Sequence, residues 1–252
     1  MNPNLAKYLI ALADDELICG HRLSEWTGHA PILEEDIAFA NLALDEIGHA
    51  RLWLELSAVQ GDEDVEKAPD KQVFFRKAEQ FRNIQMLELP NGDWAFSMLR
   101  QYLFDSLESV RLGNLKNSSE KTLAEIANKI AIEETYHLRH SQAWMKRLAL
   151  GTEESAMRSQ RALDALWPYT KQLGVEIEGE AELVGEGITF SSADIENQWR
   201  EQVEPFLGDD CELKIPDISD TPILTRSVHT EHLENLLGDM QEVARIEPEG
   251  TW

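Results

Sequence analysis

Apolar residues recur at alternating three- and four-residue steps along residues 4–27, beginning with Leu5. This spacing places them on one face of a helix, because a helix turns once every 3.6 residues or so. Glu16 is the single charged residue on that face. Residues 28–31 break the pattern, and Pro31 can occupy the first turn of a second helix. The pattern therefore predicts a helix with one buried carboxylate, followed by a turn.

The second predicted helix ends near Ala58 and carries two stripes of mostly apolar residues. One stripe consists of Glu35, Phe39, Leu42, Glu46, His49, Trp53 and Leu56. The other consists of Leu33, Ile37, Ala40, Leu44, Ile47 and Leu54. A helix that is apolar on two sides is expected to be buried on most of its surface, as in the interior of a bundle. Two polar residues of the first stripe, Glu46 and His49, would then lie among buried positions.

Two more long helices are predicted in the middle of the chain. A polar connection leads to a short helix around residues 73–87. Asp93 is a suitable N-cap for a third long helix over residues 94–115, because its carboxylate can accept from a free backbone N–H of the first turn. Residues 118–120 begin a fourth helix that ends near residue 150. The long helices thus form two antiparallel hairpins.

The pattern is weaker in the last hundred residues. A helix is predicted over residues 153–173, followed by a Gly-rich acidic stretch at 174–190 and a further helical stretch at 191–203. Residues 205–228 contain three prolines and are predicted to be extended, and a final helix covers residues 231–246. An extended segment of this length is expected to pack on a surface of the protein or on a partner.

The predicted fold is all-α. Short links within each hairpin and a longer connection between them are the connectivity of a ferritin-like four-helix bundle. We therefore predict a single ferritin-like domain over residues 1–252, in which 1–151 form the core helix bundle and 152–252 form a C-terminal helical extension with an extended segment.

A short motif occurs twice, once in each predicted hairpin. Residues 45–51 read DEIGHAR and residues 133–139 read EETYHLR, so both contain an acid, Glu, two other residues and His. Residues three apart share a helix face, so Glu46 with His49, and Glu134 with His137, can each bind one metal ion. Two such pairs, with one carboxylate from each of the other two helices, form the ligand set of a dinuclear iron site.

The remaining ligands are expected on the first and third helices. Glu16 lies 30 positions before Glu46, across a short turn. Asp105 lies 29 positions before Glu134, and Glu108 is the alternative to Asp105 on the same helix. The predicted metal ligands are therefore Glu16, Glu46, His49, Asp105, Glu134 and His137, which would hold two iron ions.

The acids that precede the motif glutamates are expected to orient the imidazoles. A ligating histidine usually donates its second ring N–H to a carboxylate or carbonyl, so Asp45 is assigned to His137 and Glu133 to His49. Arg51 and Arg139 are expected to offset some of the buried negative charge. The alternative is a cluster joined by ion pairs without metal, although buried carboxylates that lack a cationic partner are costly.

Composition and charge restrict the classes of partner. The chain of 252 residues has 23 basic and 47 acidic residues, for a formal net charge of −24. Nucleic acids and anionic membranes attract basic proteins, so both are excluded as partners. Residues 152–252 contribute two thirds of the excess negative charge. With two cysteines and an N-terminus interrupted by acids, the sequence predicts a cytoplasmic protein without a disulfide framework or membrane anchor.

Several blocks of sequence resemble the PaaC family of oxygenase components, which belong to bacterial 1,2-phenylacetyl-CoA epoxidase. They extend from the first helix to the last and read RLSEWTGHAP (residues 22–31), LEEDIAFANLALD (33–45), LPNGDWA (89–95), RQYLFD (100–105), YHLR (136–139) and VHTEHL (228–233). The resemblance implies a ferritin-like subunit of a multicomponent oxygenase of aerobic phenylacetate catabolism. It also implies that a homologous, PaaA-like subunit holds the catalytic di-iron centre, while a separate reductase supplies electrons.

The resemblance also implies that PaaC proteins lack part of the ligand set, with Gln or Ala at the positions of His49 and Glu134. This chain retains both. Three hypotheses follow, in decreasing order of support: a structural partner of the catalytic subunit, a metal-loaded oxygenase subunit that is itself redox-active, and an iron-storage protein. The acidic chain is a poor host for the phosphates of coenzyme A, so the partner subunit is expected to provide most contacts to that carrier.

Overall fold

The computed structural model describes residues 1–248 and 250, and every regular element in this part of the chain is a helix. The all-α fold class predicted from the sequence is confirmed. The predicted extension runs to residue 252, of which residues 249, 251 and 252 lie outside the described part. The elements, with 3-10 and π segments labelled η, are α1 (Pro3–Ser24), α2 (Leu33–Gly61), α3 (Ala68–Phe74), η1 (Ala78–Gln80), α4 (Gln85–Glu88), α5 (Trp94–Leu115), α6 (Lys121–Ala149), α7 (Glu153–Leu166), η2 (Trp167–Gln172), α8 (Glu180–Gly185), α9 (Ser192–Pro205), η3 (Phe206–Asp210) and α10 (Glu231–Ile246).

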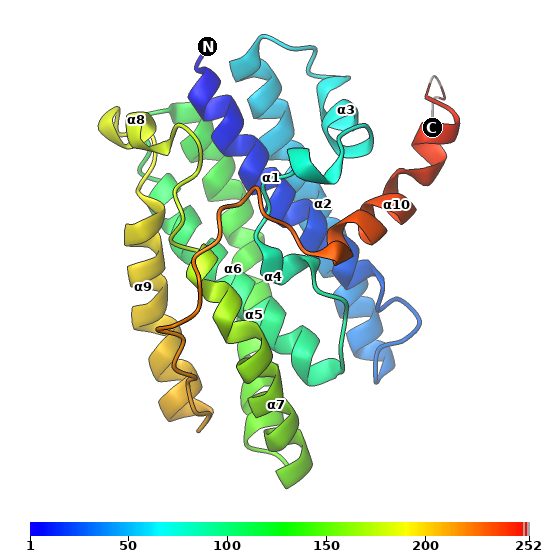
Figure 1. The fold of residues 1–252 in the computed structure, drawn as a ribbon, viewed down its shortest axis with the longest axis vertical. Helices are drawn as coiled ribbons and strands as arrows, with labels where there is room; N and C mark the ends of the chain where they lie inside the picture. The colour runs from blue at the N-terminus through cyan, green and yellow to red at the C-terminus, as the bar shows by residue number, and fades with distance from the viewer. Residues whose placement is uncertain (249, 251–252) are drawn as a thin grey trace.

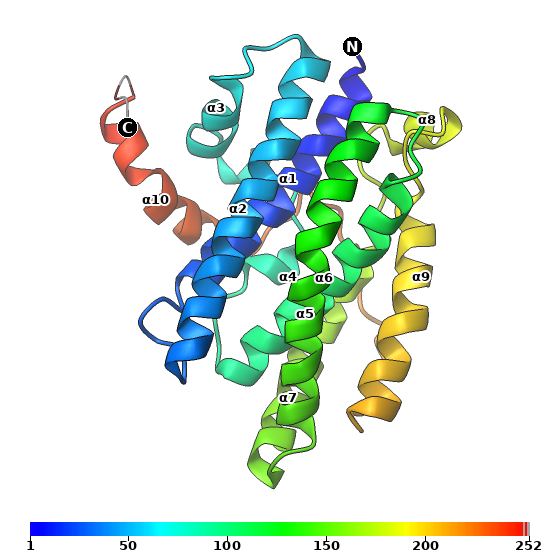
Figure 2. The same ribbon diagram turned by 180° about the vertical axis from the view of Figure 1, so that it is seen from behind.

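Four long helices form the centre of the molecule as two hairpins. Helix α1 packs along α2, α5 packs along α6, and α2 meets α6 between the hairpins. The starts of these helices follow from their caps: Asn2 accepts hydrogen bonds from the first turn of α1, and Asp93 accepts from the backbone N–H of Phe96. Figure 2 shows α2 and α6 in front of α1 and α5, so that the motif-bearing helices form one side of the bundle.

The connection between the hairpins differs from the prediction. Instead of one helix over residues 73–87, the chain forms the three short elements α3, η1 and α4. Two buried carboxylates of α1 explain the interruption. Asp14 accepts a hydrogen bond from the backbone N–H of Arg82, and Asp15 accepts one from that of Ile84, each at 2.8 Å. These backbone donors are therefore satisfied by α1 instead of by a continuing helix.

The C-terminal extension packs mainly on α1 and α5, and its helix α7 also contacts α6. Helices α7 and α9 pack on α5, and the extended segment 211–230 crosses the face of α1 before α10 packs against α3 and α4 (Figure 1). The predicted helices at 153–173, 191–203 and 231–246 are found as α7 with η2, α9 and α10. Among the described residues, each helix is too short or too polar to span a bilayer.

The exposure of α2 differs from the sequence prediction that both of its apolar stripes are buried. Of the two stripes, the one that contains Phe39 and Trp53 is buried in the core. The other is largely uncovered, with Leu33 71%, Ile37 55% and Leu44 68% exposed. Helix α2 contacts α1, α3 and α6, and none of these elements covers its outer side. An apolar pattern indicates that a helix face tends to be buried, but it does not indicate what covers that face. Among the described residues, no element covers the outer stripe of α2.

Candidate metal centre

The six predicted ligands converge in the middle of the bundle. Each of the four long helices contributes at least one side chain, and every one of these side chains is 3% exposed or less. Apolar positions at helical spacing turn the same face of each helix inward, so the polar residues in those positions are carried into the core. These residues are Glu16 on α1, Glu46 and His49 on α2, Asp105 on α5, and Glu134 and His137 on α6.

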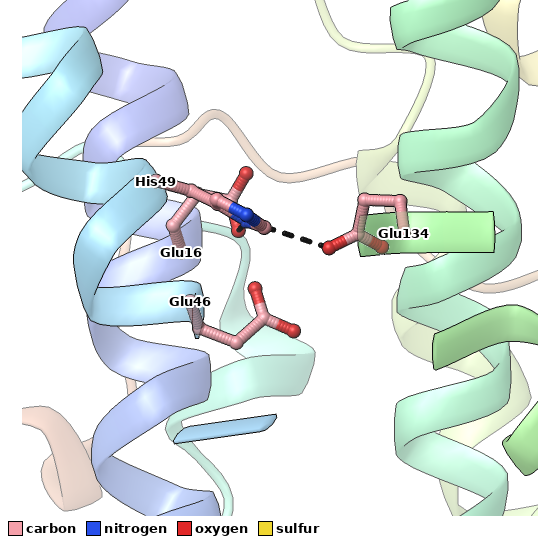
Figure 3. A group of neighbouring side chains, drawn as sticks. All are labelled: Glu16, Glu46, His49 and Glu134. Atoms are coloured by element: carbon pink, nitrogen blue, oxygen red, sulfur yellow. Dashed lines mark ion pairs between the residues drawn. The ribbon is translucent and has the colours of Figure 1, made fainter. Parts of the chain in front are cut away.

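The donor atoms form two groups that share one residue. One oxygen or nitrogen from each of Glu16, Glu46, His49 and Glu134 lies within 4.8 Å of the others, and the same holds for Glu46, Asp105 and His137. Figure 3 shows the first group, with side chains from α1 and α2 facing Glu134 across the bundle. Glu46 belongs to both groups, so it would contribute to both positions of a dinuclear site.

The structure separates the two candidate ligands of α5. Asp105 belongs to the second group. Glu108, the alternative, lies outside both groups and forms a buried ion pair with Arg111. Three residues along a helix advance a side chain by about 4.5 Å along the axis, and at that level Glu108 pairs with Arg111, which also lies 3.4 Å from Asp15 of α1.

The two imidazoles are oriented by acids from the opposite hairpin. His49 Nε2 lies 2.7 Å from Glu133, and His137 Nε2 lies 3.2 Å from Asp45. An ionised carboxylate only accepts hydrogen bonds, so Nε2 is the donor in both contacts. The Nδ1 atoms consequently face the carboxylates, at 3.4 Å from Glu134 for His49 and 3.0 Å for His137.

Many of the oxygen and nitrogen atoms that could ligate a metal have no hydrogen-bond partner in the described part of the chain. Seven such atoms are buried: Glu16 Oε1 and Oε2, Glu46 Oε2, His49 Nδ1, Glu134 Oε1 and Oε2, and His137 Nδ1. Buried polar atoms are normally paired, and seven atoms without a hydrogen bond gathered in one cluster are what a metal-binding site presents. The four carboxylates, when ionised, match the charge of two divalent cations. The residues present therefore fit a dinuclear metal site.

Two residues that sequence reasoning missed hold Asp105 in place. Gln101 donates to Asp105 at 2.6 Å and to Glu46 at 3.1 Å. Ser141 donates to the other oxygen of Asp105 at 2.6 Å. Gln101 lies one turn before Asp105 and Ser141 one turn after His137, and this i±4 spacing is the signal that could have identified them.

Electrostatics set the protonation of the metal-free cluster. Burial raises the pKa of Glu16 well above its usual value, and the neighbouring Glu46 raises it further. Burial and the charge of Glu134 raise the pKa of Asp105 to about 8. Burial would also raise the pKa of Glu134, but His137 and His49 lower it to about 2. The cluster without metal thus retains protons that a bound cation would displace.

The histidines predict how stability depends on pH. Burial alone would lower the pKa of His49, but Glu134 and Glu16 raise it from 6.5 to about 12. A raised histidine pKa contributes stability below pH 6.5 that is lost as the pH rises, by up to about 1.4 kcal/mol per pH unit. The pKa of Asp105, raised from 3.8 to about 8, likewise makes the protein less stable as the pH rises towards 8. We expect urea unfolding of chelator-treated protein to show lower stability at pH 8.5 than at pH 6.5. A constant or rising stability would contradict these shifts.

The arginines of the two motifs lie away from the cluster. Arg51 is exposed and pairs with Glu55 at 2.7 Å, and Arg139 is exposed on α6. The expectation that these arginines offset the buried charge is wrong. Each lies two residues after a motif histidine, and a side chain two positions further along a helix points to nearly the opposite side. Buried arginines instead form a second charged cluster with Asp14 and Asp15, whose members are Arg76, Arg111 and Arg226.

Two surface cavities lie away from the candidate metal centre. One, of about 480 Å³, is lined by α1, α3 and the segment around Arg226. Another, of about 270 Å³, lies outside the α1–α2 hairpin and is lined in part by Ile47, Leu54 and Phe74. Neither is lined by a residue of the metal cluster.

Comparison with known proteins identifies two full-length similarities. A family model described as phenylacetic acid catabolic protein matches residues 1–252. The chain is also 36% identical over 255 residues to a protein of Escherichia coli (strain K12) that is named as the C component of 1,2-phenylacetyl-CoA epoxidase. That alignment covers 98% of this chain and 99% of the relative.

Proposed function

We propose, since this chain belongs to the phenylacetic acid catabolic protein family, that it is a subunit of a multicomponent cytoplasmic oxygenase that epoxidises phenylacetyl-CoA. Within that complex it serves as the structural partner of a homologous, PaaA-like catalytic subunit. The observation that carries the proposal is the nearly full-length similarity to the C component of an epoxidase.

Two features support a structural role. The cavities described above do not open onto the metal cluster, whereas a CoA thioester needs an access route to the reacting metal. The chain is also strongly acidic, and the phosphates of coenzyme A favour Arg and Lys. Both features favour a substrate site in the partner subunit.

The second candidate function is metal binding by this chain itself, and the unpaired donor atoms favour it. Glu16, Glu46, His49, Asp105, Glu134 and His137 would hold two iron ions, and Glu46 is the residue that the two donor groups share. Iron would supply redox chemistry with oxygen when bound. Asp45 and Glu133 would keep the imidazoles oriented, with Nδ1 as the ligating atom.

Reconstitution tests the structural role. Purified chain is mixed with the PaaA-like component of phenylacetyl-CoA epoxidase and the reductase, and epoxide formation is measured with and without it. We expect a stable complex of the two homologous subunits and product formation that depends on both. Absence of a complex would overturn the proposal. Loss of product formation by an assembled complex that contains His137→Ala would instead assign the reaction to the metal of this chain.

A further inference from the structure

We propose that the cavity of about 480 Å³ beside α1 is a binding site for a phosphoryl group. Basic side chains reach its wall from α1, from the connection between the hairpins and from the extended segment 211–230, and they are Lys7, Arg76, Arg82 and Arg226. Figure 1 shows this segment crossing α1 before it reaches α10. The described wall includes no proposed metal ligand, so the site is separate from the candidate metal centre and goes beyond the proposed function.

The charge of the cavity wall is opposite to that of the whole chain. Four of its twelve lining residues are basic, and two, Glu176 and Glu178, are acidic. In the full sequence, acids outnumber bases by 47 to 23. Both acids of the wall are exposed to water, and Glu178 forms an exposed ion pair with Lys7, which contributes little in that setting. An anion that enters the cavity therefore meets mostly positive side chains.

Arg226 supplies an unused pair of donors. Its side chain is 4% exposed, and its hydrogen bonds in the described part of the chain, to Asp15 and to the carbonyl of Arg82, all come from Nη1. Nε is buried and has no partner among the described residues. Nε and Nη2 share one edge of the guanidinium, which can form two parallel hydrogen bonds with an oxyanion. Because a buried donor without a partner is costly, the free edge favours an acceptor from a ligand.

Buried acids hold the two inner arginines in place before a ligand binds. Asp14 accepts hydrogen bonds from both Nη atoms of Arg76, whose guanidinium carbon also lies 4.0 Å from the ring centroid of Phe81. Asp15 pairs with Arg226 at 2.9 Å. These pairs neutralise part of the positive charge, but they also fix two long side chains. Binding then costs less conformational entropy than it would with mobile arginines.

Arg82 is a cation of the wall without a carboxylate partner. In the described part of the chain its side chain donates to the backbone carbonyls of Glu79 and Phe81, at 2.9 and 2.6 Å, and forms no ion pair. Both bonds come from Nη1, so the edge formed by Nε and Nη2 is again available. Two guanidinium edges on one cavity wall are a typical recognition site for phosphate.

Hydroxyl groups add neutral donors beside Arg226. Thr225 and Ser227 precede and follow it in the sequence, line the same cavity and lie 2.9 Å apart at their side-chain oxygens. A hydroxyl has one donor hydrogen, so this pair uses only one of its two. A phosphoryl group, with three acceptor oxygens and a charge of about −1.5 to −2, can use more of these donors than a carboxylate with two oxygens. The donor set therefore favours a phosphoryl ligand.

The size of the cavity favours an organic phosphate over the free ion. A volume of about 480 Å³ falls within the range of small-molecule sites, which is about 300–1,000 Å³. Ile10 and Ile177 give the wall an apolar part that could contact an organic group. Inorganic phosphate would use the donors alone, whereas a phosphate monoester would also fill the remaining space.

The test is a ligand-observed NMR titration of the purified full-length chain in about 0.15 M salt, which screens distant surface charges. The probes are inorganic phosphate, adenosine monophosphate as a phosphate monoester, and adenosine as the same body without the phosphoryl group. Arg82→Met removes a cation of the wall, whereas Arg161→Met removes the same charge at an exposed residue of α7. We expect both phosphates to bind the unmodified chain, roughly tenfold more weakly to Arg82→Met and equally well to Arg161→Met.

A second variant controls for folding. Circular dichroism and thermal unfolding show whether Arg82→Met folds, and Ser227→Ala, at an exposed residue of the same wall, is expected to weaken phosphate binding roughly threefold. Tighter binding of adenosine monophosphate than of phosphate would assign the site to an organic phosphate, and equal affinities would assign it to the free ion. The site is overturned if neither phosphate binds, if adenosine binds as tightly as its monophosphate, or if the two arginine variants lose affinity equally.

Discussion

Arg226→Met will lower the free energy of unfolding by about 3 kcal/mol, because it leaves a buried carboxylate without its nearest cation. Arg226 is 4% exposed and donates to Asp15 at 2.9 Å and to the carbonyl of Arg82 at 3.0 Å. Arg111, 3.4 Å from Asp15, compensates only in part. The effect is measured as a shift in the midpoint of urea unfolding at constant m-value.

A surface arginine provides the control for this prediction. Arg158→Met removes ion pairs with Glu154 and Asp93, but its side chain is 48% exposed, so the expected loss is below about 1 kcal/mol. Adding Asp15→Asn to Arg226→Met removes the unpaired charge and should recover part of the lost stability. Equal effects of the two single variants would show that the buried pair contributes no more than a surface pair.

Glu46→Ala is expected to remove nearly all bound iron, of which the proposed dinuclear site would hold about two ions per chain. Glu46 is the residue that the two donor groups share, so its loss weakens both positions at once. Asp105→Ala, which affects only the second group, is expected to leave about one ion. Iron is measured by elemental analysis after purification and anaerobic reloading.

The control for metal binding is Glu125→Ala, an exposed acid on the same helix as Glu134. It should retain the iron content of the unmodified chain. Iron-free unmodified protein after reloading would contradict the dinuclear site and leave the unpaired donor atoms unexplained. Similar iron contents for Glu46→Ala and Glu125→Ala would show that iron binds elsewhere.

Local patterns predicted the long helices well. Asp93 is the cap of α5, and α10 covers the residues that the sequence pattern indicated. Caps and helical periodicity depend on neighbours within a few residues, so they can be identified without knowing the fold. The repeated Glu and His pairs likewise lie at buried positions because they share faces with apolar residues.

Long-range contacts account for what the sequence did not predict. The helix predicted around residues 73–87 is interrupted because its backbone bonds to Asp14 and Asp15, about 70 residues earlier. The contact of Gln101 with Glu46 could not be predicted because Glu46 lies on another helix, whereas the spacing of Gln101 from Asp105 was a usable local signal. The exposure of Leu44 was missed because hydrophobicity indicates a need for burial without indicating whether the covering surface belongs to the same chain.

The contact between Arg226 and Asp15 also affects when the first hairpin can finish folding during synthesis. It joins residues 211 positions apart, and at ribosomal rates of about 5–20 residues per second the arginine is made roughly 10–40 s after the aspartate. During that interval, burial of Asp15 in the first hairpin would leave this carboxylate without one of its cations. We therefore expect the hairpin to reach its final packing only after the chain is nearly complete, so that a metal ion at the proposed site would enter a finished bundle and not a nascent one.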